Sequence, residues 1–271
     1  MKIAKIIPIF KSGDCKCLNN YRPISLLPVF SKLLEKIVHK RLMTFIQNNN
    51  ILYKHQYGFQ PKHATVHPLI QFVKSITDSN DLNTKDNTIG IFLDLSKAFD
   101  TVSHSILLKK LCFYGVRGVA LDWFQSYLSD CSHYTDFDGC SSSVVEVNCG
   151  VPQASILGPL LSLIYVNDLP NCTSMNVLSY ADDTTLFKSS PCINTLCVQI
   201  NNELDKIYTW LKVNKLSLNI SKSKYMIFGP RNPHLRYQNI TIKIQDMEIE
   251  QVGTNCNTTS LNFWVCISMR N

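Results

Sequence analysis

Residues 178–187 read LSYADDTTLF and set two adjacent carboxylates, Asp182 and Asp183, between two apolar segments. The apolar residues favour two short strands, and the Ala-Asp-Asp step favours the turn of a β-hairpin between them. Two neighbouring anions repel each other and are costly to hold in one site unless a cation neutralises them. The stretch therefore predicts a hairpin whose tip binds a divalent metal ion.

A third carboxylate, Asp94, lies in the apolar segment IGIFLDL at residues 89–95. Carboxylates without a His or Cys partner suit a hard, oxygen-loving ion such as Mg²⁺. One Asp on a strand and two on an adjacent hairpin is the arrangement that two-metal nucleotidyl transfer requires. We therefore predict that Asp94, Asp182 and Asp183 bind the metal. Asp182 ranks above Asp183, because successive residues of a regular strand face opposite ways.

Further segments accompany these carboxylates in a definite order. The segments are FLDLSKAFDTV at 92–102, GVPQASILGPL at 150–160, YADD at 180–183 and LNISKSK at 218–224. Together they resemble the successive palm motifs of the non-LTR (LINE-type, jockey-like) retrotransposon reverse transcriptases. PIFKSGD at 8–14 and NYRPISLL at 20–27 are similar to the fingers motifs of the same family. The resemblance extends from about residue 7 to about residue 250.

The resemblance implies an α+β fold, a polymerase right hand with fingers and palm. Its palm would be a ferredoxin-like sheet backed by helices. The fingers would occupy residues 1–85, and the palm residues 86–250, with part of the fingers packed in 111–148. Residues 251–271 would be a degraded primer-grip region, and we expect the thumb to be missing.

The resemblance also implies roles for five residues outside the carboxylate set. Phe99 matches the aromatic that lies against the incoming sugar and excludes a 2′-hydroxyl, and Gln153 matches a polar residue beside the nucleotide. Lys11 and Arg22 match the fingers cations that contact the triphosphate. Lys222 matches a lysine near the leaving group, where a proton donor helps. A core position for Phe99 and a plain surface position for Lys11, Arg22 or Lys222 remain open alternatives.

Four residues need separate comment. Ala154 stands where the family usually has glycine, so its methyl group would cost close contact or shift the backbone. Gln60 and Cys131 stand where arginine is usual. Asp100 follows Phe99 in a turn, and we expect it to cap the next helix rather than to bind metal.

The activity implied by the resemblance is RNA-directed DNA synthesis. An RNA template would guide the addition of deoxynucleoside triphosphates to a DNA primer, with two Mg²⁺ ions at the carboxylates. A catalytically dead retroelement remnant that at most binds nucleic acid is the main alternative. An RNA-directed RNA polymerase is disfavoured by Phe99.

Composition sets wider limits. The 271-residue chain has 45% hydrophobic residues, which suits one large folded domain or two subdomains, and a net charge of +7, which suits a polyanionic partner. The apolar start is interrupted by Lys2, Lys5 and Lys11, and none of the 11 cysteines forms a Cys-x-x-Cys pair. We therefore expect an intracellular protein with reduced thiols, and no apolar run is long enough for a membrane span.

Hydrophobic spacing predicts the main elements of secondary structure. We expect helices over 103–114, 119–128 and 155–168, an amphipathic helical stripe over 196–211, and strands over 144–147 and 225–228. Residues 131–143 are polar and are expected to form turns. A further helix is expected to begin at Ser31 as its N-cap.

Overall fold

The computed structural model describes residues 2–79, 86–96, 98–229 and 240–252, and the chain divides into two compact units. Unit 1 comprises Met1–Leu52 and Lys97–Asn167, and unit 2 comprises Tyr53–Ser96 and Asp168–Asn271. The expected boundaries of fingers and palm come from the family resemblance and not from this division into compact units. These boundaries therefore stay a prediction. Most of the expected primer-grip region lies outside the described residues.

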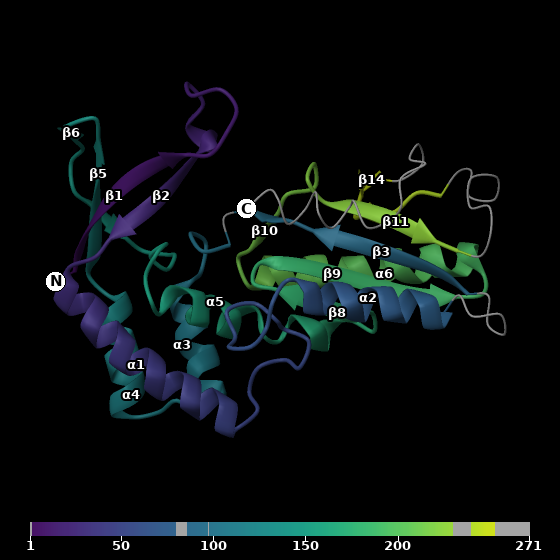
Figure 1. Cartoon of the computed structure of the whole chain (residues 1–271), viewed down its shortest axis with the longest axis horizontal. Coiled ribbons are helices and arrows are strands. Elements are labelled where there is room, and N and C mark those ends of the chain that lie inside the picture. Colours follow the sequence, from purple (N-terminus) through teal and green to yellow (C-terminus); the bar gives the residue numbers. More distant parts are fainter. Residues whose placement is uncertain (1, 80–85, 97, 230–239, 253–271) are drawn as a thin grey trace. The chain divides into compact units, whose positions relative to one another are not determined.

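Unit 2 is built on a five-stranded sheet in the order β14-β11-β3-β9-β8 (Figure 1). Its strands are β3 (Asn87–Leu93), β8 (Asn176–Tyr180), β9 (Asp183–Ser190), β11 (Lys224–Phe228) and β14 (Glu250–Gln251). β3 pairs antiparallel with both β9 and β11, and β8 pairs antiparallel with β9. In chain order, the strands β11-β3-β9-β8 are therefore fourth, first, third and second. This is the strand arrangement of a ferredoxin-like sheet, as predicted.

Two helices cover this sheet, α2 (Val66–Ser79) and α6 (Ile193–Val213), and in Figure 1 α2 lies in front of the strands while α6 lies behind them. Phe72 of α2 packs its ring edge-on against Phe92, Phe187 and Phe228, with centroids 5.2–6.0 Å apart. The predicted amphipathic stripe of α6 is confirmed, because its apolar residues are buried. These residues are Leu196, Ile200, Leu204, Ile207 and Leu211.

Unit 2 also contains short elements. They are the 3-10 helix η2 (Leu169–Cys172), the ladder of β4 (Leu95–Ser96) with β10 (Ser217–Leu218), and the ladder of β12 (Lys243–Ile244) with β13 (Met247–Glu248). The β4–β10 ladder matters most, because it begins immediately after Asp94.

Unit 1 combines a second sheet with four α-helices and a short 3-10 helix. Its strands are β1 (Ile3–Phe10), β2 (Tyr21–Leu26), β5 (Cys131–Phe137), β6 (Cys140–Ser141) and β7 (Val145–Val147). Its helices are α1 (Val29–Asn48), α3 (His104–Phe113), α4 (Val119–Leu128), α5 (Gly158–Val166) and the short 3-10 helix η1 (Leu18–Asn20). No helix in the described part of the chain is long and apolar enough to cross a membrane.

The buried Glu35 of α1 ties three parts of unit 1 together. One carboxylate oxygen accepts a 2.7 Å hydrogen bond from the Tyr127 hydroxyl of α4, and the other accepts a 2.7 Å bond from the Ile156 backbone N–H. Burial and the nearby Glu35 charge raise the pKa of Tyr127 far above its usual range. Tyr127 therefore stays a hydrogen-bond donor at any ordinary pH.

Most of the predicted elements are confirmed. The helices at 103–114 and 119–128 are α3 and α4, and α5 begins at Gly158 with a proline in its first turn. The prediction of turns over 131–143 is wrong, because β5 pairs in parallel with β1 and supplies its polar backbone with ladder hydrogen bonds. The N-cap prediction for Ser31 is also wrong. The helix already begins at Val29, directly after the extended Pro28.

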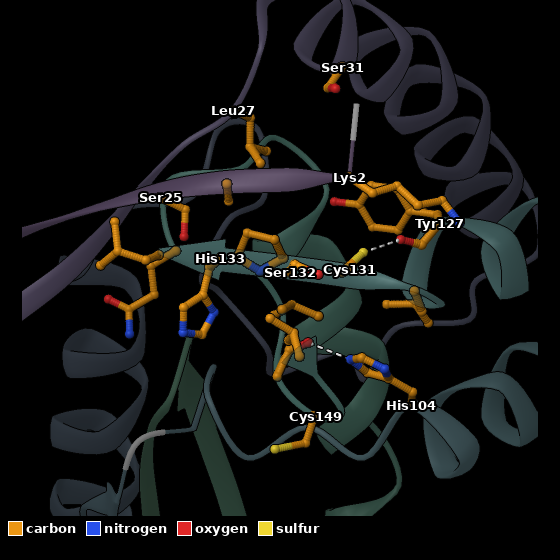
Figure 2. Close-up of a pocket in the computed structure, with 18 of the residues that line it drawn as sticks. Lys2, Ser25, Leu27, Ser31, His104, Tyr127, Cys131, Ser132, His133 and Cys149 are labelled. Carbon is orange, nitrogen blue, oxygen red and sulfur yellow. Dashed lines mark hydrogen bonds between the residues drawn. The ribbon is translucent and has the colours of Figure 1, made fainter. Parts of the chain in front are cut away.

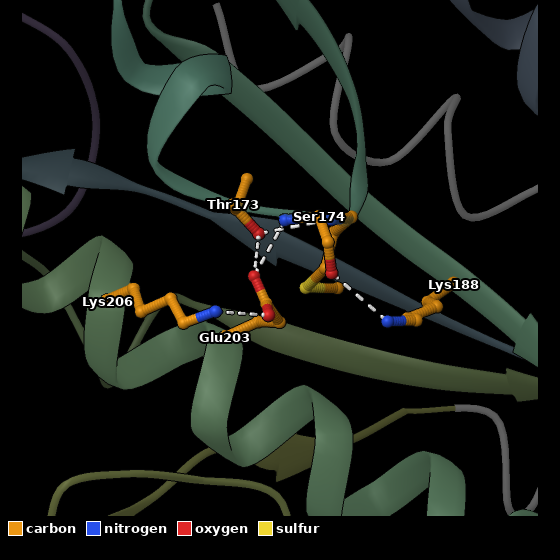
Figure 3. Close-up of polar contacts among 6 residues, drawn as sticks. Thr173, Ser174, Lys188, Glu203 and Lys206 are labelled. Carbon is orange, nitrogen blue, oxygen red and sulfur yellow. Dashed lines mark hydrogen bonds and ion pairs between the residues drawn. The ribbon is translucent and has the colours of Figure 1, made fainter.

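A buried carboxylate fastens α6 to the segment before β8 (Figure 3). Glu203 accepts hydrogen bonds from the Thr173 hydroxyl (2.8 Å), the Ser174 backbone N–H (2.7 Å) and the Lys206 ammonium (2.7 Å). Burial alone would raise the pKa of Glu203, but these donors outweigh it and lower the pKa to about 2. The ionised carboxylate therefore stabilises the fold.

We expect Glu203→Gln to lower the free energy of unfolding by about 2 kcal/mol. The amide NH₂ of glutamine would face groups that are themselves hydrogen-bond donors, so at least one of them would lose its acceptor. The loss should be complete above pH 4.5, the ordinary pKa of the side chain, and should fade as the pH falls towards 2. Urea unfolding at several pH values measures this. Glu248→Gln, at an exposed ion pair with Lys243, is the matched control and should change stability little.

Candidate active site

The predicted hairpin is present, and its turn carries the two adjacent carboxylates. Tyr180 pairs with Asp183 as the last pair of the β8–β9 ladder, so Ala181 and Asp182 form a two-residue turn. Ala181 has a φ of +59°. This is the first central position of the turn, where a hairpin commonly places glycine. Asp182 is exposed at the tip, and Asp183 is half-buried at the start of β9.

Strand pairing brings Asp94 to the same end of the sheet. Leu93 pairs with Thr184 as the last pair of the β3–β9 ladder, so Asp94, the next residue, lies at the end of the sheet where β9 begins with Asp183. Burial first, and then the charges of Asp182 and Asp94, together raise the pKa of Asp183 to about 6. The three predicted ligands are thus electrostatically coupled.

The donor chemistry of this set fits a hard divalent cation. All three side chains offer carboxylate oxygens, and the raised pKa of Asp183 shows a repulsion that a bound cation would relieve. Among the described residues, no three His, Cys, Asp or Glu side chains are grouped closely enough to hold a metal ion by themselves. The assignment of Asp94, Asp182 and Asp183 as the metal ligands, like the ranking of Asp182 above Asp183, stays a prediction.

The backbone of Asp94 is fixed on both sides by the loop between β10 and β11. Its N–H donates to the Ser223 hydroxyl (3.2 Å), and its carbonyl accepts from the Asn219 N–H (2.8 Å). Ser223 is fully buried and donates in turn to the Asn219 carbonyl (2.9 Å). Lys222 lies in this loop and is exposed. Lys222 therefore lies on the loop that is hydrogen-bonded to the backbone of Asp94.

Sequence reasoning gives no role to Ser223, because a serine between two lysines looks like a solvated position. The signal that could identify it is its place in the motif 218–224, next to Lys222. The contact partner, Asp94, is 129 residues away along the chain. The contact between Asp94 and Ser223 is therefore seen only in the folded structure, where β3 and β11 are paired.

The predicted nucleotide-contacting residues Phe99 and Gln153 lie on two adjoining loops of unit 1. The Phe99 carbonyl accepts from the Val151 N–H (2.8 Å), and the Gln153 side chain donates to the Asp100 carboxylate (2.9 Å). Phe99 is half-buried rather than part of the core. The helix-cap prediction for Asp100 is wrong. α3 begins at His104, too far along the chain for capping, and Asp100 instead accepts from Gln153.

Ala154 follows in the second of these loops and has a φ of +69°. A left-handed backbone is the conformation that favours glycine, which is the residue expected here from the resemblance. The backbone at Ala154 therefore has the conformation that suits glycine, although the residue is alanine.

A cavity of about 590 Å³ in unit 1 is lined by Gln153 and Asp100 among others. Figure 2 labels further lining residues, including His104, Tyr127 and Cys131. His104 closes part of its wall by donating from Nε2 to the Gly150 carbonyl (2.7 Å), and the Cys131 thiol bonds to the Tyr127 carbonyl (3.2 Å). Cys131, which stands where arginine is usual, is therefore a half-buried wall residue.

The predicted triphosphate-contacting cations share the β1–β2 hairpin. Arg22 pairs with Ile9 in the ladder, and the exposed Lys11 follows β1 directly, its N–H donating to the Asn20 carbonyl (2.8 Å). Lys11, Arg22, Phe99 and Gln153 all belong to unit 1, whereas the carboxylates and Lys222 belong to unit 2. The roles of these four residues stay predictions.

The family model for reverse transcriptase (RNA-dependent DNA polymerase) matches residues 9–258. The chain belongs to this family. A similar protein is the RNA-directed DNA polymerase from mobile element jockey of Drosophila melanogaster, 30% identical over 85% of this chain and 26% of the relative. The probable RNA-directed DNA polymerase from transposon BS of the same organism is 32% identical over 82% of this chain and 25% of the relative. The predicted resemblance to jockey-like elements is confirmed.

Solved structures of telomerase share the fold. Apo telomerase from Candida tropicalis superposes with a TM-score of 0.60 at 12% identity, covering 92% of this reverse transcriptase chain and 47% of the telomerase. Telomerase from Candida albicans, in complex with a telomeric RNA fragment, gives 0.59 at 14% identity, covering 91% and 43%. The chain spans about a quarter of the length of its curated relatives.

We expect Asp183→Asn to raise the free energy of unfolding of the metal-free protein by about 1–2 kcal/mol at neutral pH. The pKa of Asp183 is raised from 3.8 to about 6, so its ionised form is less favourable in the folded chain than in the unfolded chain. The stabilising effect of protonation is complete below pH 3.8 and is lost as the pH rises through 6.

Urea unfolding in the presence of a chelator measures the effect. The advantage of the variant should shrink as the pH falls from 6 and disappear below 3.8, where Asp183 becomes protonated in the unfolded chain as well. Asp246→Asn, at an exposed position of unit 2, is the control and should change little. A destabilised Asp183→Asn protein at neutral pH would show that the carboxylate is neutralised within the apo fold.

Proposed function

We propose that this chain is the polymerase part of a non-LTR retrotransposon reverse transcriptase. It would add deoxynucleotides to the 3′ end of a DNA primer under the direction of an RNA template. The observation that carries the proposal is the position of Asp94, Asp182 and Asp183 at one end of the ferredoxin-like sheet, near enough for the charges of Asp94 and Asp182 to act on Asp183. No observation favours the alternative of a dead remnant.

The carboxylates would hold two divalent ions through their oxygens. When bound, such ions lower the pKa of the primer 3′-hydroxyl and neutralise the triphosphate and the departing pyrophosphate. The sheet contributes rigidity, because Asp94 is fixed by two backbone hydrogen bonds and Asp183 by its pairing with Tyr180. Holding the reacting atoms in line accounts for much of the rate in such a transfer.

The remaining residues would bind and select the nucleotide. Lys11 and Arg22 would neutralise the triphosphate, and Lys222 would donate a proton to the departing pyrophosphate. Phe99 would block a 2′-hydroxyl, and Gln153 would contact the nucleotide beside it. The half-buried position of Phe99 supports this role, since a ring that selects a sugar must be partly accessible.

Primer extension on an RNA template with Mg²⁺ tests the activity. We expect Asp94→Asn and Asp182→Asn to reduce the rate by more than about 100-fold, a loss that even outer-shell partners of a metal can cause. Asp246→Asn should retain the rate of the unmodified chain. No extension by the unmodified chain in any divalent metal, or full extension by Asp94→Asn, would contradict the proposal.

Sugar selection is a separate prediction. Phe99→Val should admit ribonucleotides by opening space at the 2′ position, while use of deoxynucleotides changes much less. The measurement is kcat/KM for each sugar in single-nucleotide extension. Phe113→Val, at an exposed position of unit 1, is the control. Unchanged discrimination by Phe99→Val would assign Phe99 a packing role instead.

A further inference from the structure

A short segment of unit 2 runs alongside the strand that leads into the carboxylate turn. Gln56 forms a parallel bridge with Ser179 of β8. The Tyr57 N–H donates to the Ser179 carbonyl (2.8 Å), and the Ser179 N–H donates to the His55 carbonyl (3.0 Å). The segment therefore continues the sheet beyond β8 and reaches the start of the turn.

The side chain of Gln56 holds the peptide groups of Ala181. Its Oε1 accepts from the Ala181 N–H (3.1 Å) and from the Gly58 N–H (2.8 Å), and its Nε2 lies 3.4 Å from the Ala181 carbonyl oxygen. Gln56 is only 5% exposed. A buried amide whose oxygen is shared by two backbone donors fixes both of them in direction, because leaving either unpaired is costly.

The backbone at Gly58 lies directly against the same alanine. A Cβ added at Gly58 would lie 2.0 Å from the Ala181 nitrogen and 2.6 Å from its Cα. No side chain fits there, so the close approach depends on glycine. The Gln60 side chain donates to the Gln56 carbonyl (2.5 Å) and closes this segment on itself.

Ala181 needs such support. Its φ of +59° is unfavourable for a residue with a side chain, and such conformations persist where the surroundings over-determine them. Asp182 follows Ala181 directly, so a rotation of the peptide between them redirects the Asp182 carboxylate and displaces Asp183. Gln56 and Gly58 are the contacts that hold Ala181 from outside the hairpin.

We propose that Gln56 is a positioning residue for the carboxylate turn: its side-chain amide fixes the Ala181 peptide and thereby the directions of Asp182 and Asp183. This inference rests on the proposed function, because the two carboxylates matter as metal ligands. It predicts that loss of the amide weakens the use of metal more than the binding of nucleotide.

The test compares Gln56→Met with Gln56→Glu. Methionine has the same length but accepts no comparable hydrogen bond, whereas glutamate keeps an acceptor oxygen for the Ala181 and Gly58 N–H groups. In metal-free protein, amide hydrogen exchange at these two residues should be at least about 10-fold faster in Gln56→Met. Gln56→Glu should restore the protection. Gln199→Met, at an exposed position of α6, is the matched control.

Activity supplies the second measurement. For Gln56→Met, the Mg²⁺ concentration for half-maximal extension should rise by about 10- to 100-fold, the usual effect of losing an outer-shell partner. The KM for the deoxynucleotide should change much less. If Gln56→Met fails to fold, Gln56→Asn, which is too short to reach Ala181, carries the same expectations.

Several outcomes would overturn the inference. Unchanged exchange at Ala181, or an unchanged Mg²⁺ requirement in an active variant, would show that the turn holds its shape without Gln56. Faster exchange spread evenly over unit 2 with a lowered melting temperature would assign Gln56 a general stabilising role. If the unmodified chain itself is inactive, the proposed function fails, while the exchange experiment still decides whether Gln56 orders the turn.

Discussion

The antiparallel pairing of β3 with β9 is the constraint on which the candidate site depends. The ladder runs from Asn87 opposite Ser190 to Leu93 opposite Thr184, and Asp94 and Asp183 are the next residues at that end. A slip of one residue would move one of these acids to the other face of the sheet. The register is fixed by the Phe72 ring against Phe92 and Phe187, with Gly90 leaving room, since a Cβ there would lie 2.7 Å from the Phe72 ring. The packing of these core rings thereby positions the two carboxylates.

Two features at the same end of the sheet are destabilising. Contacts from elsewhere in unit 2 hold the residues around them in place. Like charges meet at Asp183, and a non-glycine residue occupies a left-handed turn position at Ala181. The loop with Ser223 fixes Asp94, and Gln56 holds Ala181. Repulsion and strain of this kind are characteristic of functional sites, where stability is traded for a set of groups ready to bind a ligand. A purely structural hairpin would gain nothing from either feature.

Local sequence patterns predicted the features that depend on neighbouring residues. Apolar strands around Asp94 and around the Ala-Asp-Asp turn, and the stripe along α6, follow from side-chain spacing alone. The Ser31 cap failed locally, because the helix begins two residues earlier, at Val29. Other failures involve long-range partners. β5 is polar and forms a strand because β1 lies beside it. Asp100 lies too far before α3 to cap it, and its carboxylate accepts instead from Gln153, 53 residues away along the chain. The support of Ala181 by Gln56 joins residues 125 positions apart, so neither segment contains a sign of it.

Two alanines in glycine-like conformations show how context decides the cost of such a position. Ala154 and Ala181 have φ values of +69° and +59°, each unfavourable by about 1–2 kcal/mol relative to an ordinary helical or extended backbone. Ala154 is exposed in a loop, where a small shift disturbs little around it. Ala181 precedes two charged residues that repel each other, so any relaxation of its backbone would also let the carboxylates separate. The turn therefore needs a contact from outside the hairpin, and a buried amide that bonds to its backbone provides one without adding charge to an already anionic site.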